Sequence, residues 1–191
     1  MARWQEGLIS GALALLLQSP ADALEVERLD VSFQNDRYVV IFKAQLRAQA
    51  EAVGAVLRDY ENYPALDPRI TESRVLPSNH DGRVRLFTRM WGCVGGLFCR
   101  TMQRVEVVEE RPGELIATAV LSESDVHFGV TRSEWSPHDG GTALGYRLEI
   151  MPKFWIPPLF GRRLMITTLR EGTLSLFTNV ESAAQRVGSS E

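Results

Sequence analysis

The sequence predicts an α+β fold, in which a curved antiparallel sheet of about seven to eight strands wraps around one long C-terminal helix, with a short helical region after the first hairpin. Three observations predict this class. Most of the chain after residue 26 alternates apolar and polar residues with a period of two. Clear turn sequences separate the alternating segments, and one C-terminal segment keeps helical spacing over about 25 residues.

The first hairpin is predicted from two alternating segments around a turn. The segment "LDVSF" places Leu29, Val31 and Phe33 on one face, and "RYVVIFKAQLR" at 37–47 follows after the turn "QND". Residues 48–60 then change to helical spacing with an apolar stripe. Prolines in the next residues prevent this helix from continuing.

Six more strands are expected between the first helix and the last one. The turns between them, "PSNHDG", "VGGL", "RPGE", "SESD" and "PHDGG", are short, which favours antiparallel neighbours. A single helix laid across a curved sheet touches it along a line, so we expect space to remain inside. The expected strands are 70–76, 83–93, 98–110, 115–121, 126–136 and 142–151, and the expected helix is 162–186.

Composition limits the class of partner. The chain has 191 residues, of which 45% are hydrophobic and 24% charged, with a formal net charge of −3 and well-mixed signs. This size and composition fit one globular domain with a sizeable core. Because no basic face is evident, a nucleic-acid partner is not expected.

The N-terminal segment predicts export. The uncharged run "LISGALALLL" at 8–17 is too short to span a bilayer, which needs about 20 residues, but has the length of a signal-peptide core. The residues before Leu24 fit cleavage after Ala23. We therefore expect a signal peptide at 1–23 and a periplasmic or secreted single ligand-binding domain at 24–191. The alternative is an amphipathic or buried N-terminal helix on a cytoplasmic protein, since Glu6 offsets Arg3.

Two segments carry a resemblance to a known superfamily. The stretches "VLRDYENYPALDPRI" at 56–70 and "LREGTLSLFTNVESAA" at 169–184 contain a helix ending in Asp59-Tyr60 before a proline-containing loop, a strand opening at Ile70, and a terminal helix with Asn179. With the order of elements, they resemble the START-like (SRPBCC) helix-grip superfamily over about residues 37–186. The chain is most similar to the branch of polyketide cyclase/dehydrase and coenzyme Q-binding proteins. The resemblance implies an internal cavity for a hydrophobic ligand, closed by the terminal helix and nearby loops.

Aromatic and large apolar residues are the candidates for the lining of such a cavity. The loop "FWIPPLF" at 154–160 is unusual because it is apolar where a polar connection is expected. It is either a static core plug or a gate that makes transient contact with a membrane. The expected lining residues are Tyr60, Tyr63, Met90, Phe128, Trp135, Tyr146, Phe154, Trp155, Phe160, Leu169 and Phe177.

The two cysteines, Cys93 and Cys99, flank a glycine pair in "CVGGLFC". A three-residue loop at 95–97 would place them opposite each other and permit a disulfide, whereas a two-residue Gly-Gly loop would turn the thiols to opposite faces. The bridge and two separate thiols both remain open at this point. A zinc site is not expected, because two ligands are too few.

No catalytic motif is evident, since HxH, HExxH and GxSxG patterns are absent from the sequence. Alternation turns most strand charges to solvent, and no ionisable pair inside the cavity can be identified. The candidates for an acid–base role in the cavity are five strand residues: Arg89, Arg132, Glu134, Tyr146 and Glu149. We therefore expect non-catalytic binding or transport of a lipid or isoprenoid quinone, without a cofactor or metal. The alternatives are a polyketide cyclase/dehydratase-like enzyme using cavity acid–base residues, and a membrane-associated scaffold. Export argues against the enzyme, since polyketide cyclisation normally uses cytoplasmic intermediates.

Overall fold

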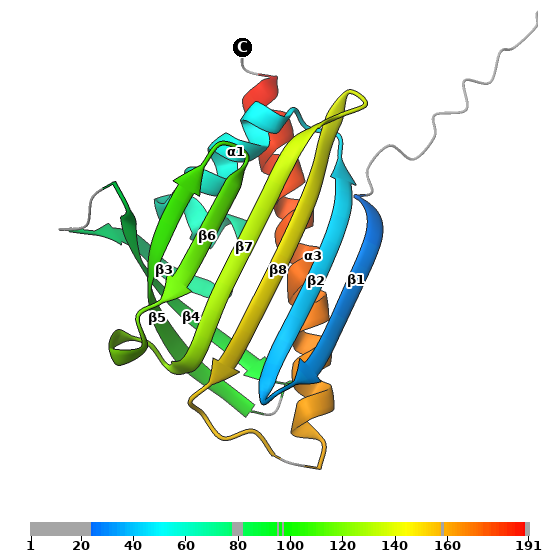
Figure 1. The fold of residues 1–191 in the computed structure, drawn as a ribbon. Coiled ribbons are helices and arrows are strands. Elements are labelled where there is room, and N and C mark those ends of the chain that lie inside the picture. The colour runs from blue at the N-terminus through cyan, green and yellow to red at the C-terminus, as the bar shows by residue number, and fades with distance from the viewer. Residues whose placement is uncertain (1–23, 78–81, 95, 97, 158, 190–191) are drawn as a thin grey trace, which may run out of the picture.

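A computed structural model describes residues 24–77, 82–94, 96, 98–157 and 159–189 (Figure 1). The expected signal segment at 1–23, with its cleavage site, lies outside the described residues. None of the helices in the described ranges is both long and apolar enough to cross a membrane.

Eight strands form one antiparallel sheet in the order β1-β2-β8-β7-β6-β5-β4-β3. The β1–β2 hairpin turns at Asn35 and Asp36, both in the left-handed region with φ of 49° and 59°, as a tight hairpin turn requires. The strands are β1 (Glu25–Gln34), β2 (Arg37–Leu46), β3 (Ile70–Leu76), β4 (Val84–Val94), β5 (Phe98–Arg111), β6 (Glu114–Ala119), β7 (Val126–His138) and β8 (Gly141–Pro152).

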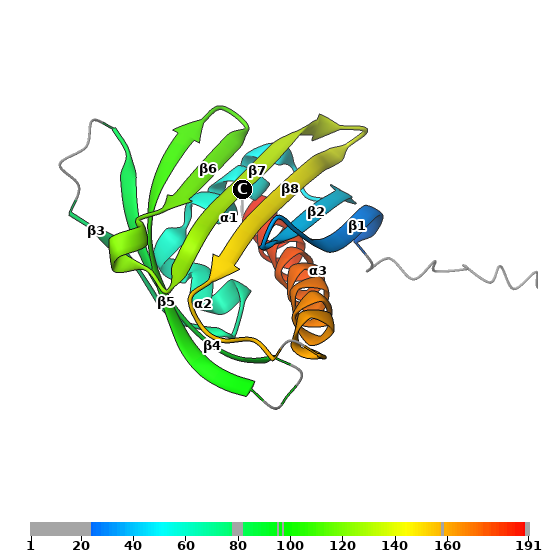
Figure 2. The ribbon, with the colours of Figure 1, turned by 60° about the horizontal axis from the view of Figure 1, so that its bottom comes forward.

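The helices lie on the concave side of the sheet. Helix α3 (Gly161–Gly188) has 28 residues, about 42 Å at 1.5 Å per residue, and the sheet curves around it (Figure 2). Helix α1 (Ala50–Arg58) packs against the C-terminal half of α3, and the short α2 (Tyr63–Leu66) follows it. The predicted α+β class, the long terminal helix and the short helical region after the first hairpin are confirmed.

Several element boundaries differ from the expectation by one to three residues, and two of these differences bear on the site. Helix α1 ends at Arg58, because Asp59 leaves helical geometry at φ −81° and ψ 67° and a separate 3₁₀ turn, η1 (Tyr60–Asn62), begins. Strand β6 ends at Ala119, because Leu121–Glu123 forms a second 3₁₀ turn, η2. Both turns bear on the site: η1 contains Tyr60, which points inward, and the segment around η2 hydrogen-bonds to the β5 backbone at Val105.

The core holds α3 onto the sheet mainly through aromatic contacts. Phe177 of α3 stacks on Phe42 of β2 with ring centres 4.9 Å apart, and Tyr146 of β8 meets it edge-on at 5.0 Å. Around these rings, a cluster of buried apolar residues fills the space beneath α1. A second cluster, which includes Val126 and Met165, lies toward the N-terminal end of α3. The interior between the sheet and α3 is not completely filled.

Candidate functional site

A cavity of about 540 Å³ lies between the concave face of the sheet, the α2 region and α3. Alternate positions of the strands point into it, as the period of two requires. On β4 these positions are Leu86, Thr88 and Met90, and on β5 they run from Met102 to Val108. The walls are mostly apolar, which suits a hydrophobic ligand.

Most of the expected lining residues do line this cavity. They come from five parts of the chain: the η1–α2 region, strand β4, strand β8, the loop after β8, and α3. The residues that the structure brings together are Tyr60, Tyr63, Met90, Tyr146, Phe154, Trp155, Leu169 and Phe177.

Three expected residues lie elsewhere. Phe128 stands in the opposite phase of β7 from Trp135 and the cavity-lining Thr131 and Ser133, so alternation places it on the outer face of the sheet, where Arg37 stacks on its ring at 3.6 Å. Trp135 points inward but beyond the end of the cavity, under α1, where a Cβ atom on Gly54 would lie 2.8 Å from its indole nitrogen. Phe160 precedes α3 and is 48% exposed.

The structure also brings charged residues into the cavity. Arg104 and Glu106, on successive inward positions of β5, lie 3.5 Å apart between Nη2 and Oε2, with side chains only 16% and 5% exposed. Arg104 pairs in register with Thr88 of β4. Among the described residues, Arg104 Nε, Glu106 Oε1 and Thr88 Oγ1 are buried without a hydrogen-bond partner. We call Thr88, Arg104 and Glu106 the polar cluster.

A second ion pair lines the cavity beside α3. Arg69 Nε donates to Asp67 Oδ1 at 2.8 Å, and Asp67 is buried. The guanidinium of Arg69 lies so close to Gly172 of α3 that a Cβ atom there would clash with it. Nearby, Asn179 of α3 donates to the carbonyl of Leu66 at 2.8 Å. These contacts tie the 66–69 loop to the terminal helix that closes the cavity.

Two tyrosines complete the polar surroundings of the cavity. Burial raises the pKa of Tyr146 to about 12, an effect that the Arg104 guanidinium opposes and the Glu106 carboxylate reinforces. Burial also raises the pKa of Tyr63, with the Glu106 carboxylate adding to the effect, and the Tyr63 hydroxyl donates to the carbonyl of Leu57 at 2.8 Å. Both phenols are therefore protonated at neutral pH, and Tyr146 can serve as a hydrogen-bond donor to a ligand.

Sequence reasoning missed the polar cluster for a physical reason. On β5, apolar residues occur in both phases of the alternation, with Met102 and Val108 in one and Val105 and Val107 in the other. Val105, in the phase opposite to the cavity-lining residues, is itself buried at 5% exposed. Arg104 and Glu106 share the inward phase with Met102 and Val108, so the interior does contain an ionisable pair. A local alternation pattern could not reveal which phase is covered.

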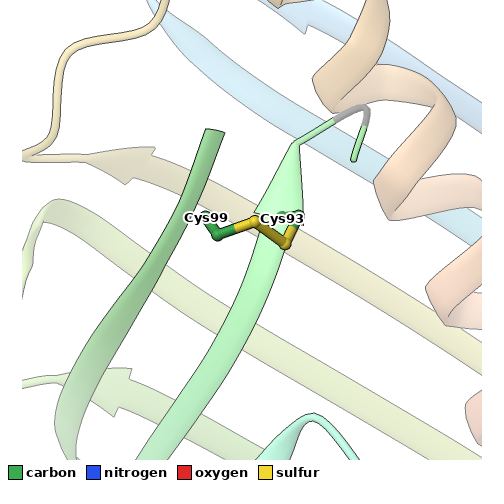
Figure 3. The surroundings of a disulfide bond; sticks show 2 residues. All are labelled: Cys93 and Cys99. Carbon is green, nitrogen blue, oxygen red and sulfur yellow. A yellow bond between two sulfur atoms is a disulfide. The ribbon is translucent and has the colours of Figure 1, made fainter. Parts of the chain in front are cut away.

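The cysteines lie at the open end of the cavity, on the hairpin between β4 and β5 (Figure 3). The register pairs Val94 with Phe98 and Cys93 with Cys99, as a three-residue loop requires. Their sulfur atoms are bonded at 1.96 Å, with the Cα atoms 3.8 Å apart. Gly96 supplies the left-handed turn at φ 71°. The bridge therefore closes the tip of this hairpin.

Removing the bridge is expected to cost stability. The double substitution Cys93→Ser/Cys99→Ser should lower the free energy of unfolding by about 2 kcal/mol, because a bridge of this short span limits the unfolded chain. Urea denaturation of the oxidised protein and the variant measures the difference. Reductant should shift the wild type by the same amount and leave the variant unchanged. Two titratable thiols in unreduced, exported protein would contradict the bridge.

Solved structures with similar folds can be compared with this geometry. A START superfamily protein from Mycobacterium smegmatis superposes with a TM-score of 0.61 and 20% identity, over 78% of this chain and 98% of its own. The Zhui aromatase/cyclase from Streptomyces sp. R1128 superposes with a TM-score of 0.63 and 15% identity, over 79% of this chain and 96% of its own. A STAR-related lipid transfer protein from Xanthomonas axonopodis superposes with a TM-score of 0.57 and 16% identity, over 82% of this chain and 98% of its own. This chain has the START-like helix-grip fold.

The START-like resemblance deduced from the sequence is therefore confirmed at the level of the fold. No protein-family model matches the sequence, and neither does any curated protein. The similar structures include both a lipid transfer protein and an aromatase/cyclase, so the START-like fold does not by itself decide between binding and catalysis. That decision must come from the cavity of this chain.

Proposed function

We propose that this protein binds a hydrophobic small molecule, a lipid or an isoprenoid quinone, in its internal cavity and carries it without chemical change. The observation that supports this most is the cavity of about 540 Å³, which lies within the usual range of small-molecule sites and has mostly apolar walls. Binding would come from burial of apolar surface, at roughly 25 cal/mol per Å².

The polar cluster gives the ligand its orientation in this proposal. Arg104 and Thr88 present hydrogen-bond donors, and Glu106 presents an acceptor, at atoms that have no partner within the described part of the chain. Leaving such atoms unpaired in the interior costs free energy, so a ligand that pairs with them is favoured over a pure hydrocarbon. We therefore expect an amphipathic ligand whose polar end carries an oxygen acceptor for Arg104 and Thr88, and a ligand that also carries a hydroxyl group can donate to Glu106.

Export to the periplasm or the cell exterior is part of the same proposal. Two features support it: the signal-like segment at 1–23, and a disulfide, which persists in oxidising compartments. Strand β1 begins at Glu25, so cleavage after Ala23 would leave the eight described strands intact.

The direct test is native mass spectrometry of protein purified from its own host, followed by extraction and identification of bound molecules. A carrier should retain an extractable lipid or quinone at about one per chain. If the host's membranes contain such lipids or quinones and the purified protein carries none of them, the proposal is contradicted.

Filling the cavity should weaken binding of that ligand. Thr168 of α3 is half-buried and lines the cavity, whereas the neighbouring Thr167 is exposed. We expect Thr168→Phe to bind the extracted ligand about tenfold more weakly, because overpacking costs on the order of 1–3 kcal/mol. Thr167→Phe is the matched control and should bind as the wild type does. Fluorescence or calorimetric titration measures both, and equal affinities for the two variants would place the ligand elsewhere.

A second candidate function, acid–base catalysis of the cyclase/dehydratase type, is favoured by one observation. The Arg104–Glu106 pair lines the same cavity as the protonated phenol of Tyr146. Such groups can stabilise a developing negative charge and move a proton. The same mass spectrometry separates the two functions: a carrier returns its ligand with an unchanged mass, whereas an enzyme releases a product of different mass, and Glu106→Gln would slow that conversion.

A further inference from the structure

We infer that the open end of the cavity docks onto the surface of an anionic lipid bilayer. This inference rests on the proposed function, because the docked opening is where a hydrophobic ligand would pass between protein and membrane. We call this region the mouth, and define it by the described residues of two segments: the β4–β5 hairpin tip at 91–100 and the loop and first turn of α3 at 153–163.

The two segments of the mouth lie together at one end of the molecule (Figures 1 and 2). The loop after β8 and the start of α3 meet there with the ends of β4 and β5. Both segments line the cavity, through residues that include Cys93 and Cys99 on one side and Phe154 and Ile156 on the other. The guanidinium of Arg100 lies 5.6 Å from the ring centre of Phe154, which links the hairpin to the loop.

The mouth concentrates large apolar side chains that are open to solvent. Leu159 is 94% exposed, Trp155 72%, Trp91 52% and Phe160 48%. The other exposed large hydrophobic residues within the described ranges are scattered over separate elements: Val26, Val75, Leu121 and Val187. Exposed apolar groups that gather around an opening mark a contact surface, and tryptophan is the side chain that prefers the boundary between water and lipid.

Charge around this apolar surface is of one sign. The segments at 91–100 and 153–163 contain four cations, Arg100, Lys153, Arg162 and Arg163, and no Asp or Glu. Although the whole chain carries a net charge of −3, the mouth is therefore positive. A basic rim around apolar residues complements an anionic lipid surface, at about 1 kcal/mol for each cation near that surface.

Two acidic groups lie in or beside the neighbouring η2 region. Glu123 is paired with Arg85 at 2.7 Å, whereas Asp125 keeps its negative charge while its carboxylate accepts the neutral backbone N–H of Gln103 at 2.9 Å. Lys153 donates from Nζ to the neutral carbonyls of Leu121 and Ser124. One carboxylate beside four cations leaves the region positive. Charge complementarity thus favours an anionic bilayer over an uncharged one.

Vesicle co-sedimentation of the mature chain tests this inference. One set of vesicles is phosphatidylcholine alone, and the other also contains phosphatidylglycerol. We expect tighter binding to the mixed vesicles, and Arg162→Gln/Arg163→Gln should weaken that binding roughly 30-fold, at about 1 kcal/mol per cation. Trp155→Ser should weaken binding to both kinds of vesicle, because it removes apolar surface rather than charge.

Two control variants change the same chemistry outside the mouth. Val187→Ser removes an exposed apolar side chain at the far end of α3, and Arg28→Gln/Arg74→Gln removes two exposed arginines with side chains 52% and 55% accessible. Both should bind vesicles as the wild type does. Equal loss in the control and mouth variants, or no binding to either kind of vesicle, would overturn the inference.

Native mass spectrometry of the same preparations keeps the two proposals distinguishable. A bound lipid or quinone without vesicle binding would leave the carrier function standing and refute the docking surface. Vesicle binding that depends on Trp155 and Arg162/Arg163, in a protein that never holds a ligand, would support docking and refute the carrier, which is the scaffold alternative.

Discussion

Replacing Arg104 with methionine is expected to lower the free energy of unfolding by about 3 kcal/mol, because Glu106 would remain as a buried carboxylate without its partner. The Glu106 side chain is only 5% exposed, and its Oε1 atom has no hydrogen-bond partner among the described residues. Urea denaturation, followed by far-UV circular dichroism, measures the change. Stability should return close to that of the wild type in Arg104→Met/Glu106→Leu, since removing both charges also removes the cost of burying them.

The matched control for this experiment is Arg100→Met on the same strand. Arg100 is exposed, so its loss should change stability by less than about 0.5 kcal/mol. If Arg104→Met were as mild as Arg100→Met, the Arg104–Glu106 pair would not be held in the interior as the structure places it. The double variant Arg104→Met/Glu106→Leu also tests binding. Because it folds but lacks the two charged groups of the polar cluster, it should discriminate less between an amphipathic ligand and a plain hydrocarbon.

Truncating Phe177 to alanine should produce a loss of similar size, about 3–4 kcal/mol. Phe177 is 1% exposed and touches two other rings, Phe42 and Tyr146, at 4.9 and 5.0 Å between centres. It is therefore a principal contact between α3 and the sheet. Because the site borders an existing cavity, the residue's removal joins two empty spaces, and little collapse is expected to compensate.

Thr178→Ala provides the comparison on the same helix. The Thr178 side chain is exposed and donates only to the Leu174 carbonyl of its own helix, so its loss should leave stability nearly unchanged. Denaturant titration of the two variants gives the difference directly. A small effect of Phe177→Ala would mean that α3 is held mainly by other contacts of its C-terminal half, through α1 and the hydrogen bond from Asn179 to Leu66.

The fold could be predicted because its signals are local. Alternation from Leu29 onward, turn sequences such as "QND" and "RPGE", and a helical stripe ending near Ala184 each act within a few residues. The candidate site was predictable only in part. Residues such as Met90 and Leu169 line the cavity as expected, whereas Phe128 does not, because it stands in the opposite phase of β7 from the cavity-lining Thr131 and Ser133.

What the sequence by itself determined is the succession of strands and helices, and with it a sheet that needs a cover and leaves space beneath a single rod. Only the tertiary structure decided what occupies that space. The inward phase of β5 puts Arg104 and Glu106 in the cavity beside Met102 and Val108, and α1 fills the end of the interior that Trp135 faces. The physical reason is that alternation specifies two faces of a strand, while the segments that pack on each face come from distant parts of the chain.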